Sequence, residues 1–125
     1  MRERLGTGEP ANDDVNSIPS QLRARLLDNG TRTANGEDHD PYPVVRLFVA
    51  DGPASWLLTE LDPDDPDLAY GLCDLGLGAP VLDYVRLSDL ATVASDHIRC
   101  DADFAARQTL SAYLREAREA CAIRP

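Results

Sequence analysis

The chain has 125 residues, 43% of them hydrophobic, and a formal net charge of −10 at pH 7, which predicts one domain with a core of its own. Its 12 basic side chains, all arginine, are outnumbered by 22 acidic ones, so direct binding to the phosphate backbone of nucleic acid is disfavoured. An acidic surface instead suits a basic partner protein, including one whose usual ligand is DNA.

Residues 1–17 are polar, contain glycine and proline, and offer little to bury. We therefore expect a disordered N-terminal tail over 1–17 and a single domain over 18–125. The tail lacks the apolar core of a signal peptide, and no run approaches the ~20 apolar residues of a membrane span. The three cysteines form no close pair, which argues against a disulfide framework. These features predict a cytoplasmic protein without a membrane anchor.

A short helix is expected where the ordered part begins. Ser20 can cap it, and Asn29-Gly30 supplies a signal for its end. The apolar residues at helical spacing within it are Leu22, Leu26 and Leu27. The polar stretch 31–40 is then expected to be a loop.

The central part of the chain predicts a sheet. Apolar segments of strand length alternate there with short breaks rich in glycine, proline and aspartate, and breaks this short connect neighbouring antiparallel strands. We therefore predict an α+β fold: an antiparallel four-stranded meander over about residues 44–87, packed by an N-terminal helix and a C-terminal helix. The four predicted strands are Val44–Ala50, Ser55–Leu61, Leu68–Leu75 and Val81–Leu87.

The alternation of side chains assigns residues to the two faces of this sheet. In the second strand it places Trp56, Leu58 and Glu60 on one face, and Leu57, Thr59 and Leu61 on the other. Gly71, inside the third strand, indicates a bulge or a neighbour that needs close approach. Three aromatic residues on adjacent strands could form a surface, although a helix-covered core is the favoured interpretation: Trp56, Tyr70 and Tyr84.

After the meander, Ser88 is expected to cap a short helix that reaches about Ala94. An edge strand around His97–Cys100 would follow. Thr109 is expected to cap a last helix. The predicted buried stripe of that helix has helical spacing and comprises Leu110, Tyr113, Leu114, Ala117 and Cys121.

Three stretches of the sequence resemble a known family. They are PVVRLFVADGPASWLLTELDPDDPDLAYGLCDLGLGAPVLDYVRLSDL, the earlier IPSQLRARLLDNG and the later TLSAYLREAR, and together they span about Ile18 to Arg118. The sequence is similar to a small bacterial family known only as a domain of unknown function, with members on conjugative plasmids and integrative elements. The resemblance implies an α+β domain and a mobile-element context, and it implies no catalytic activity or residue assignment.

The densest charge lies at the end of the second predicted strand and in the break that follows it. A calcium loop counted from Asp62 would need glycine at its sixth position and glutamate at its twelfth, where the chain has Asp67 and Cys73. The segment is therefore either a rigid solvated turn or an acidic patch that binds a partner protein. We predict five partner-binding carboxylates within it, and no metal site, cofactor or catalytic residue: Glu60, Asp62, Asp64, Asp65 and Asp67.

An enzymatic alternative depends on isolated residues. His39 and His97 could converge with carboxylates on a metal, although their spacing does not require it. Cys100, beside an arginine, is the best candidate for a reactive thiol, whereas Cys73 is expected in the core. The turn Gly76-Leu77-Gly78 lacks the lysine of a phosphate loop.

These observations leave three hypotheses for the function. The favoured one is a non-enzymatic, small acidic protein-interaction module of a mobile genetic element. Its sharper form is an anti-defence protein that mimics the charge of DNA and occupies a DNA-handling complex. The alternatives are a small metal- or Cys/His-dependent enzyme and a homo-oligomeric plasmid-maintenance regulator.

Overall fold

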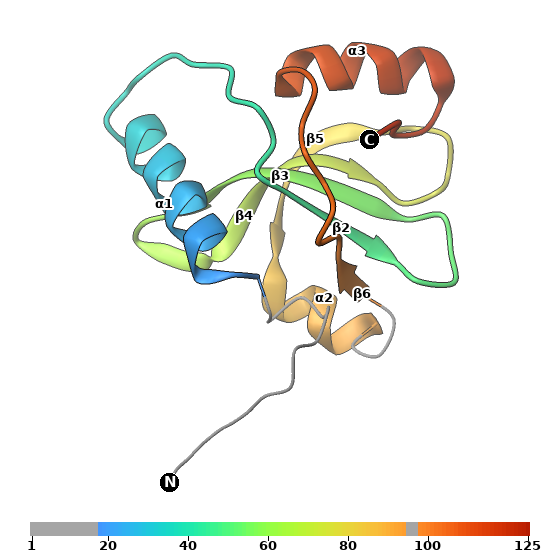
Figure 1. Cartoon of the computed structure of the whole chain (residues 1–125), viewed down its shortest axis with the longest axis horizontal. Helices are drawn as coiled ribbons and strands as arrows, with labels where there is room; N and C mark the ends of the chain where they lie inside the picture. Colours follow the sequence, from blue (N-terminus) through green and yellow to red (C-terminus); the bar gives the residue numbers. More distant parts are fainter. Residues whose placement is uncertain (1–17, 95–97) are drawn as a thin grey trace, which may run out of the picture.

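A computed structural model describes residues 18–94 and 98–125, and the predicted tail and His97 lie outside these ranges. Its strands form one antiparallel sheet in the order β5-β4-β3-β2-β6 (Figure 1). The predicted α+β fold and meander are confirmed, and short β6 adds a fifth strand beside β2. The elements are α1 Ser20–Ala34, β2 Val45–Val49, β3 Ser55–Asp62, β4 Asp65–Asp74, β5 Val81–Arg86, α2 Leu87–Ala94, β6 Ile98–Cys100 and α3 Leu110–Ala120.

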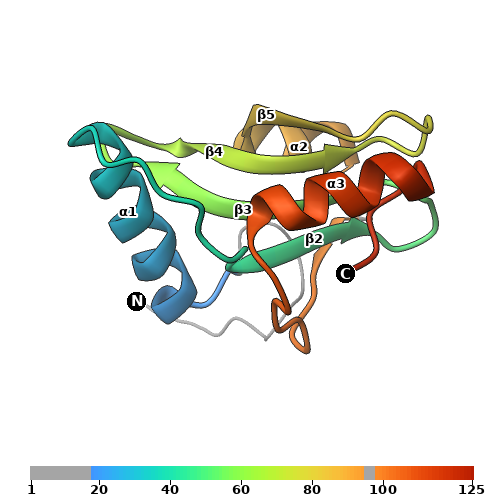
Figure 2. The same ribbon diagram turned by 90° about the horizontal axis from the view of Figure 1, so that it is seen from above.

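Helices pack on both faces of the sheet, so each face has its own apolar cluster. The cluster under α1 and α2 contains Leu26, Leu58 and Leu61, and the cluster under α3 contains Leu57 and Tyr113. In Figure 1, α3 lies above the sheet and α2 below it. Figure 2 shows the sheet from the side of α3. Helix α3 covers one part of this sheet face, and no helix covers the part of the face beside α1.

Helix α1 is longer than the sequence predicts, because Gly30 does not end it. The helix continues to Ala34. Gly30 is buried against β3, where a Cβ atom would lie only 1.8 Å from the carbonyl oxygen of Leu61, so the missing side chain allows helix and strand to approach. The expected cap at Ser20 is also wrong: Ser20 is the first helical residue, and the N-cap residue is Pro19, which makes no side-chain capping bond.

The acidic break between β3 and β4 is a tight hairpin rather than a six-residue loop. Asp62 pairs with Asp65 across the two strands, which leaves only Pro63 and Asp64 between them. The side chain of Asp62 accepts a hydrogen bond from the Asp64 N–H at 2.8 Å. This local bond is a common device of aspartate in turns, and it orients the carboxylate toward its own backbone.

A bulge in β3 changes which face its last residues occupy. Leu58 pairs with Gly71, but the next pair along the strands is Glu60 with Tyr70, so Thr59 has no partner of its own. Glu60 therefore joins Leu57 on the α3 face, and Leu61 joins the opposite face. The predicted alternation beyond Leu58 is thus wrong, whereas the prediction that Gly71 marks a bulge or close approach is confirmed.

Carboxylates from distant segments cap the last two helices. Asp67 of β4 accepts hydrogen bonds from the N–H and hydroxyl of Ser88 at 2.9 and 2.6 Å. Asp40 likewise accepts both bonds from Ser111, including its N–H at 3.0 Å. The predicted cap at Ser88 is wrong, because Ser88 lies inside α2. Thr109 is the N-cap residue of α3 as predicted, but its side chain makes no capping bond to the helix.

Candidate functional site

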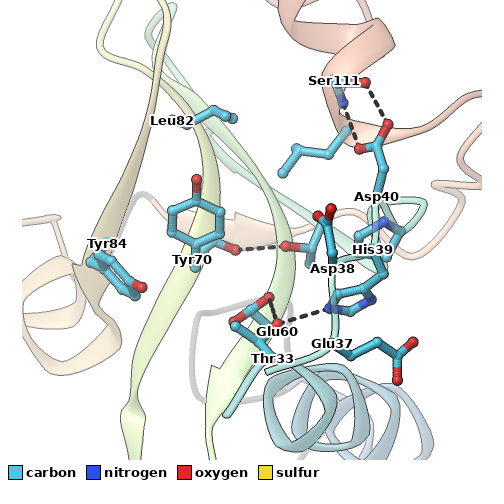
Figure 3. A pocket seen from close by; sticks show the side chains of 13 residues that line it. Thr33, Glu37, Asp38, His39, Asp40, Glu60, Tyr70, Leu82, Tyr84 and Ser111 are labelled. Atoms are coloured by element: carbon cyan, nitrogen blue, oxygen red, sulfur yellow. Dashed lines mark hydrogen bonds between the residues drawn. The ribbon is translucent and has the colours of Figure 1, made fainter. Parts of the chain in front are cut away.

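The sheet face beside α3 contains a pocket of about 450 Å³. Its walls are the loop at residues 37–41, the N-terminus of α3 and side chains of β3, β4 and β5 (Figure 3). A second hollow of about 170 Å³ shares Glu60, Tyr70 and Tyr84 with this pocket and extends it to Asp62. We call the two together the acidic groove.

Carboxylates dominate the charge of the acidic groove. The described residues that line it include no arginine, and His39 is the one lining side chain that can become cationic. Arg32, on α1, pairs with Glu37, and its hydrogen bond holds the pKa of Glu37 below the ordinary value. The acidic side chains that line the groove are Glu37, Asp38, Asp40, Glu60 and Asp62.

Both carboxylate oxygens of Asp40 accept hydrogen bonds from Ser111 at the start of α3. Burial would raise its pKa, but hydrogen bonds from the hydroxyl and N–H of Ser111 outweigh burial, and the pKa lies below its usual value. Among the described residues, Asp38, Glu60 and Asp62 have no cationic partner. These three carboxylates are therefore the charges that the groove can offer to a ligand.

Glu60 is held in place by a chain of two hydrogen bonds. The Thr33 hydroxyl donates to Glu60 Oε2 at 2.9 Å and lies 2.8 Å from His39 Nε2. A hydroxyl has one proton to donate, so His39 must carry its proton on Nε2 and donate it to Thr33. The buried Nδ1 of His39 has no hydrogen-bond partner within residues 18–94 and 98–125. This chain ties β3, the end of α1 and the following loop to one carboxylate.

Two tyrosines form the floor beside Glu60. The rings of Tyr70 and Tyr84 have centroids 4.8 Å apart and planes inclined by 53°. Tyr84 is 57% exposed, so its ring is open to solvent. Burial and then the charges of its neighbours raise the pKa of Tyr70, and the phenol stays protonated. The groove thus combines exposed aromatic surface with fixed negative charge.

The structure separates the five carboxylates that the sequence groups together. Glu60 and Asp62 line the acidic groove, and Asp64 is at the hairpin turn. Asp65 lies 2.8 Å from an arginine nitrogen of β5. Asp67 caps α2, and the hydrogen bond from the hydroxyl of Ser88 holds the pKa of Asp67 below the ordinary value. The five residues therefore do not form one free acidic surface.

Two residues of the enzymatic alternative, His39 and Cys100, lie on opposite faces of the sheet, and the third, His97, lies outside the described residues. His39 lines the groove on the α3 face, whereas Cys100 is 8% exposed in the cluster on the opposite face. Burial raises the pKa of Cys73 to about 11, as expected for a core thiol. Cys121 does not complete the buried stripe of α3, because it is exposed just after the helix with a φ of 59°. The described residues contain no group of histidine, cysteine and acidic side chains that could hold a metal.

Two features of the groove escaped the sequence analysis. Asp38 was not singled out, although it lies in an acidic run directly before His39. Tyr70 and Tyr84 were noted only together with Trp56, which is buried on the opposite face. The sequence signal available was that the two tyrosines lie on adjacent predicted strands. The strand register, which places Tyr70 directly opposite Tyr84, could be known only from the structure.

The comparison with protein families found one match, which covers most of the chain. A family described as "Protein of unknown function (DUF2958)" matches residues 17–124. The chain belongs to this family. The match covers every described helix and strand of the DUF2958 domain, including all parts of the acidic groove. Searches of curated proteins and of solved structures found no match. Within the described part of the DUF2958 domain, no helix has the length and apolar character needed to cross a membrane.

Proposed function

We propose that this DUF2958 chain is a non-enzymatic interaction module of a mobile genetic element, which binds a basic partner protein in the cytoplasm. The observation that supports this most is the acidic groove, in which Asp38, Glu60 and Asp62 lie together without a cationic partner among the described residues. Complementary charge steers association and excludes wrong partners. The net charge of −10 acts in the same direction.

The five predicted partner-binding residues contribute unequally in this proposal. Glu60, Asp62 and Asp64 are available for direct contact. Asp65 and Asp67 already bind protein groups, so they add to the negative field of this side of the molecule. The partner surface is thus centred on the groove and the hairpin turn rather than on the hairpin alone.

The proposal has a sharper form, in which the partner is a DNA-handling protein of the host. A surface rich in carboxylates can occupy a site that normally receives phosphates, because both present negative oxygen to arginine and lysine. The chain would then be an anti-defence protein that mimics the charge of DNA. Duplex DNA should displace it from such a partner, and displacement should weaken with salt.

The test is affinity capture from the native host with three versions of the full chain. The groove variant is Asp38→Asn/Glu60→Gln/Asp62→Asn. The matched control carries Asp89→Asn/Asp103→Asn/Glu119→Gln, at exposed positions outside the groove. Each variant loses three negative charges and keeps the shape of every side chain, so a difference between them reports location rather than net charge.

We expect wild type and control to retain the same partner in low salt and to release it in high salt, and the groove variant to retain less. Equal recovery by the groove variant would remove the groove from the proposal. Recovery that falls equally in both variants would mean that net charge alone determines binding. Added duplex DNA tests the sharper form, because a partner that it does not displace is not held at its DNA site.

Self-association is the second candidate function, favoured by one observation. The edge strand β5 and the hairpin before it expose large apolar side chains, which could pair with another copy at the open edge. These side chains are Leu75, Leu77, Val81 and Tyr84. Light scattering at several concentrations tests this candidate, and a strict monomer would exclude a homo-oligomeric regulator.

A further inference from the structure

The bulge at Thr59 has a direct consequence for the acidic groove. With regular alternation, Glu60 would share a face with Leu58 and the core under α1. The extra residue instead places Glu60 opposite Tyr70 on the α3 face. Bulges are frequent where a strand must re-aim a side chain at a functional site.

Several contacts hold this bulge in one geometry. Asn29 of α1 donates a hydrogen bond to the Thr59 carbonyl at 2.9 Å, and the Thr59 hydroxyl donates to the Tyr70 carbonyl at 3.2 Å. Thr59 is 1% exposed. Gly71 opposite has no side chain to obstruct the strand, and a Cβ atom there would lie 2.0 Å from a β3 carbonyl oxygen. The position of Glu60 is therefore fixed by the fold.

The carboxylate of Glu60 is oriented but only half used. Thr33 occupies Oε2, and no described residue donates to Oε1. Tyr70 and the exposed ring of Tyr84 line the same groove as this carboxylate and provide an aromatic surface there, with Tyr70 between Tyr84 and Glu60 (Figure 3). Asp38 adds a second carboxylate without a cationic partner at the loop wall.

We propose that the acidic groove receives the guanidinium group of one arginine side chain of the partner protein. This rests on the proposed function, which it makes specific. The planar cation stacks on the exposed ring of Tyr84 and donates to Glu60 Oε1, with Asp38 as a second acceptor. A guanidinium suits this arrangement better than an ammonium, because it has a flat face for the ring and several donors for the carboxylates. The pocket volume of about 450 Å³ is within the range of small-ligand sites.

The test uses N-acetyl-arginine amide as the probe for an arginine within a protein chain. The isotope-labelled full chain is titrated with it, and amide chemical shifts are followed by NMR. The matched probes are the citrulline derivative, which is a neutral isostere, and the lysine derivative, which has a charge but no plane. We expect saturable shifts around Thr33, Glu60, Tyr70 and Tyr84, with a Kd in the millimolar range.

Citrulline should give no saturable shifts, and lysine should bind several-fold more weakly than arginine. Equal binding of lysine and arginine, or shifts outside the groove, would overturn the assignment to a guanidinium. Absence of saturation at tens of millimolar arginine derivative would overturn it as well.

Substitutions test the two contact types. Glu60→Gln should weaken arginine binding about tenfold, as for loss of a charge-assisted hydrogen bond. Tyr84→Leu should weaken it about threefold, the size of an exposed cation–π contact. Glu119→Gln and Tyr42→Leu are the matched controls at exposed positions outside the groove. Unchanged affinity in both groove variants would overturn the inference.

The outcome is separable from that of the proposed function. If the groove variant loses its partner but the arginine derivative does not bind, the inference fails and the proposed function stands. If the arginine derivative binds in the groove but partner capture is the same for all three chains, the inferred chemistry stands and the proposed function fails.

Discussion

Gly30→Ala tests how closely α1 is held to the sheet. A Cβ atom at residue 30 would lie 1.8 Å from the carbonyl oxygen of Leu61 and 2.9 Å from its carbonyl carbon, whereas real Cβ contacts stay beyond 3.0 Å. The obstacle is strand backbone, which cannot rotate away as a flexible side chain would. Helix α1 would therefore have to move outward, and Leu26, which is fully buried, would lose part of its packing.

The sign of the effect follows from two opposing magnitudes. Alanine in place of glycine stabilises an unobstructed helix interior by about 1 kcal/mol. Overpacking a close contact costs about 1–3 kcal/mol, and the backbone obstacle places Gly30→Ala at the upper end. The expected net loss is about 2 kcal/mol, which lowers the urea midpoint by about 1 M.

Equilibrium urea unfolding, followed by the fluorescence of Trp56, measures this loss. Thr31→Ala is the matched control, since Thr31 is the next residue of α1 and is exposed. Its replacement should stabilise the helix by a few tenths of a kcal/mol. Opposite signs at adjacent positions are the expected result. A Gly30→Ala chain as stable as Thr31→Ala would refute the close contact of α1 with β3.

Three further predictions concern the sheet, a helix cap and the thiols. Gly71→Ala should cost about 3 kcal/mol or more, because its Cβ atom would lie 2.0 Å from the Leu57 carbonyl oxygen; a urea midpoint equal to wild type would contradict this register. Asp40→Ala should cost about 1 kcal/mol at neutral pH, the size of a helix cap. The pKa of Asp40 is lowered in the folded chain, so the stability difference between wild type and Asp40→Ala should persist above the unfolded pKa and vanish as pH falls through the folded pKa. Urea unfolding between about pH 7 and pH 3 measures this difference. A stability difference that grows on acidification would contradict the prediction. Among the cysteines of the native chain, exposed Cys121 should react fastest with a thiol reagent, because Cys73 is buried with a pKa of about 11; peptide mass mapping that finds equal rates would contradict this.

The sequence predicts the fold wherever the signals are local and periodic. Apolar runs of strand length with short breaks between them were sufficient for the meander, and helical spacing was sufficient for α3. Helix end and cap signals read from neighbouring residues gave wrong predictions where contacts with distant parts of the chain determine the structure. Gly30 is a stop signal in isolation, but contact with Leu61 makes it a packing residue inside α1. Asp40 and Asp67 could not be predicted as caps, because their helices are far away in sequence.

The candidate site was predicted in part for the same reason. The density of acidic residues along the chain identified Glu60 and Asp62, which line the groove. Sequence alone could not show that Asp65 pairs with Arg86 across the sheet. Nor could it show that a bulge moves Glu60 to the other face, since register depends on pairing with β4. The sequence shows where acidic residues are dense. Strand register and ion pairs in the fold determine which of these carboxylates remain without a cationic partner.

The net charge alone does not locate a binding surface, because several carboxylates are buried or cap helices. Asp74 is 3% exposed and accepts hydrogen bonds from the N–H groups of Gly76 and Ile123 at 2.8 and 3.0 Å, so its charge fastens a turn and the C-terminal segment. Asp40 and Asp67 fasten helices in the same way. A partner that recognises this chain must therefore distinguish used from unused carboxylates. Among the described residues, the groove brings Asp38 and Glu60, which have no cationic partner, together with the exposed ring of Tyr84. Localised neutralisation there, compared with equal neutralisation elsewhere, is therefore the decisive comparison.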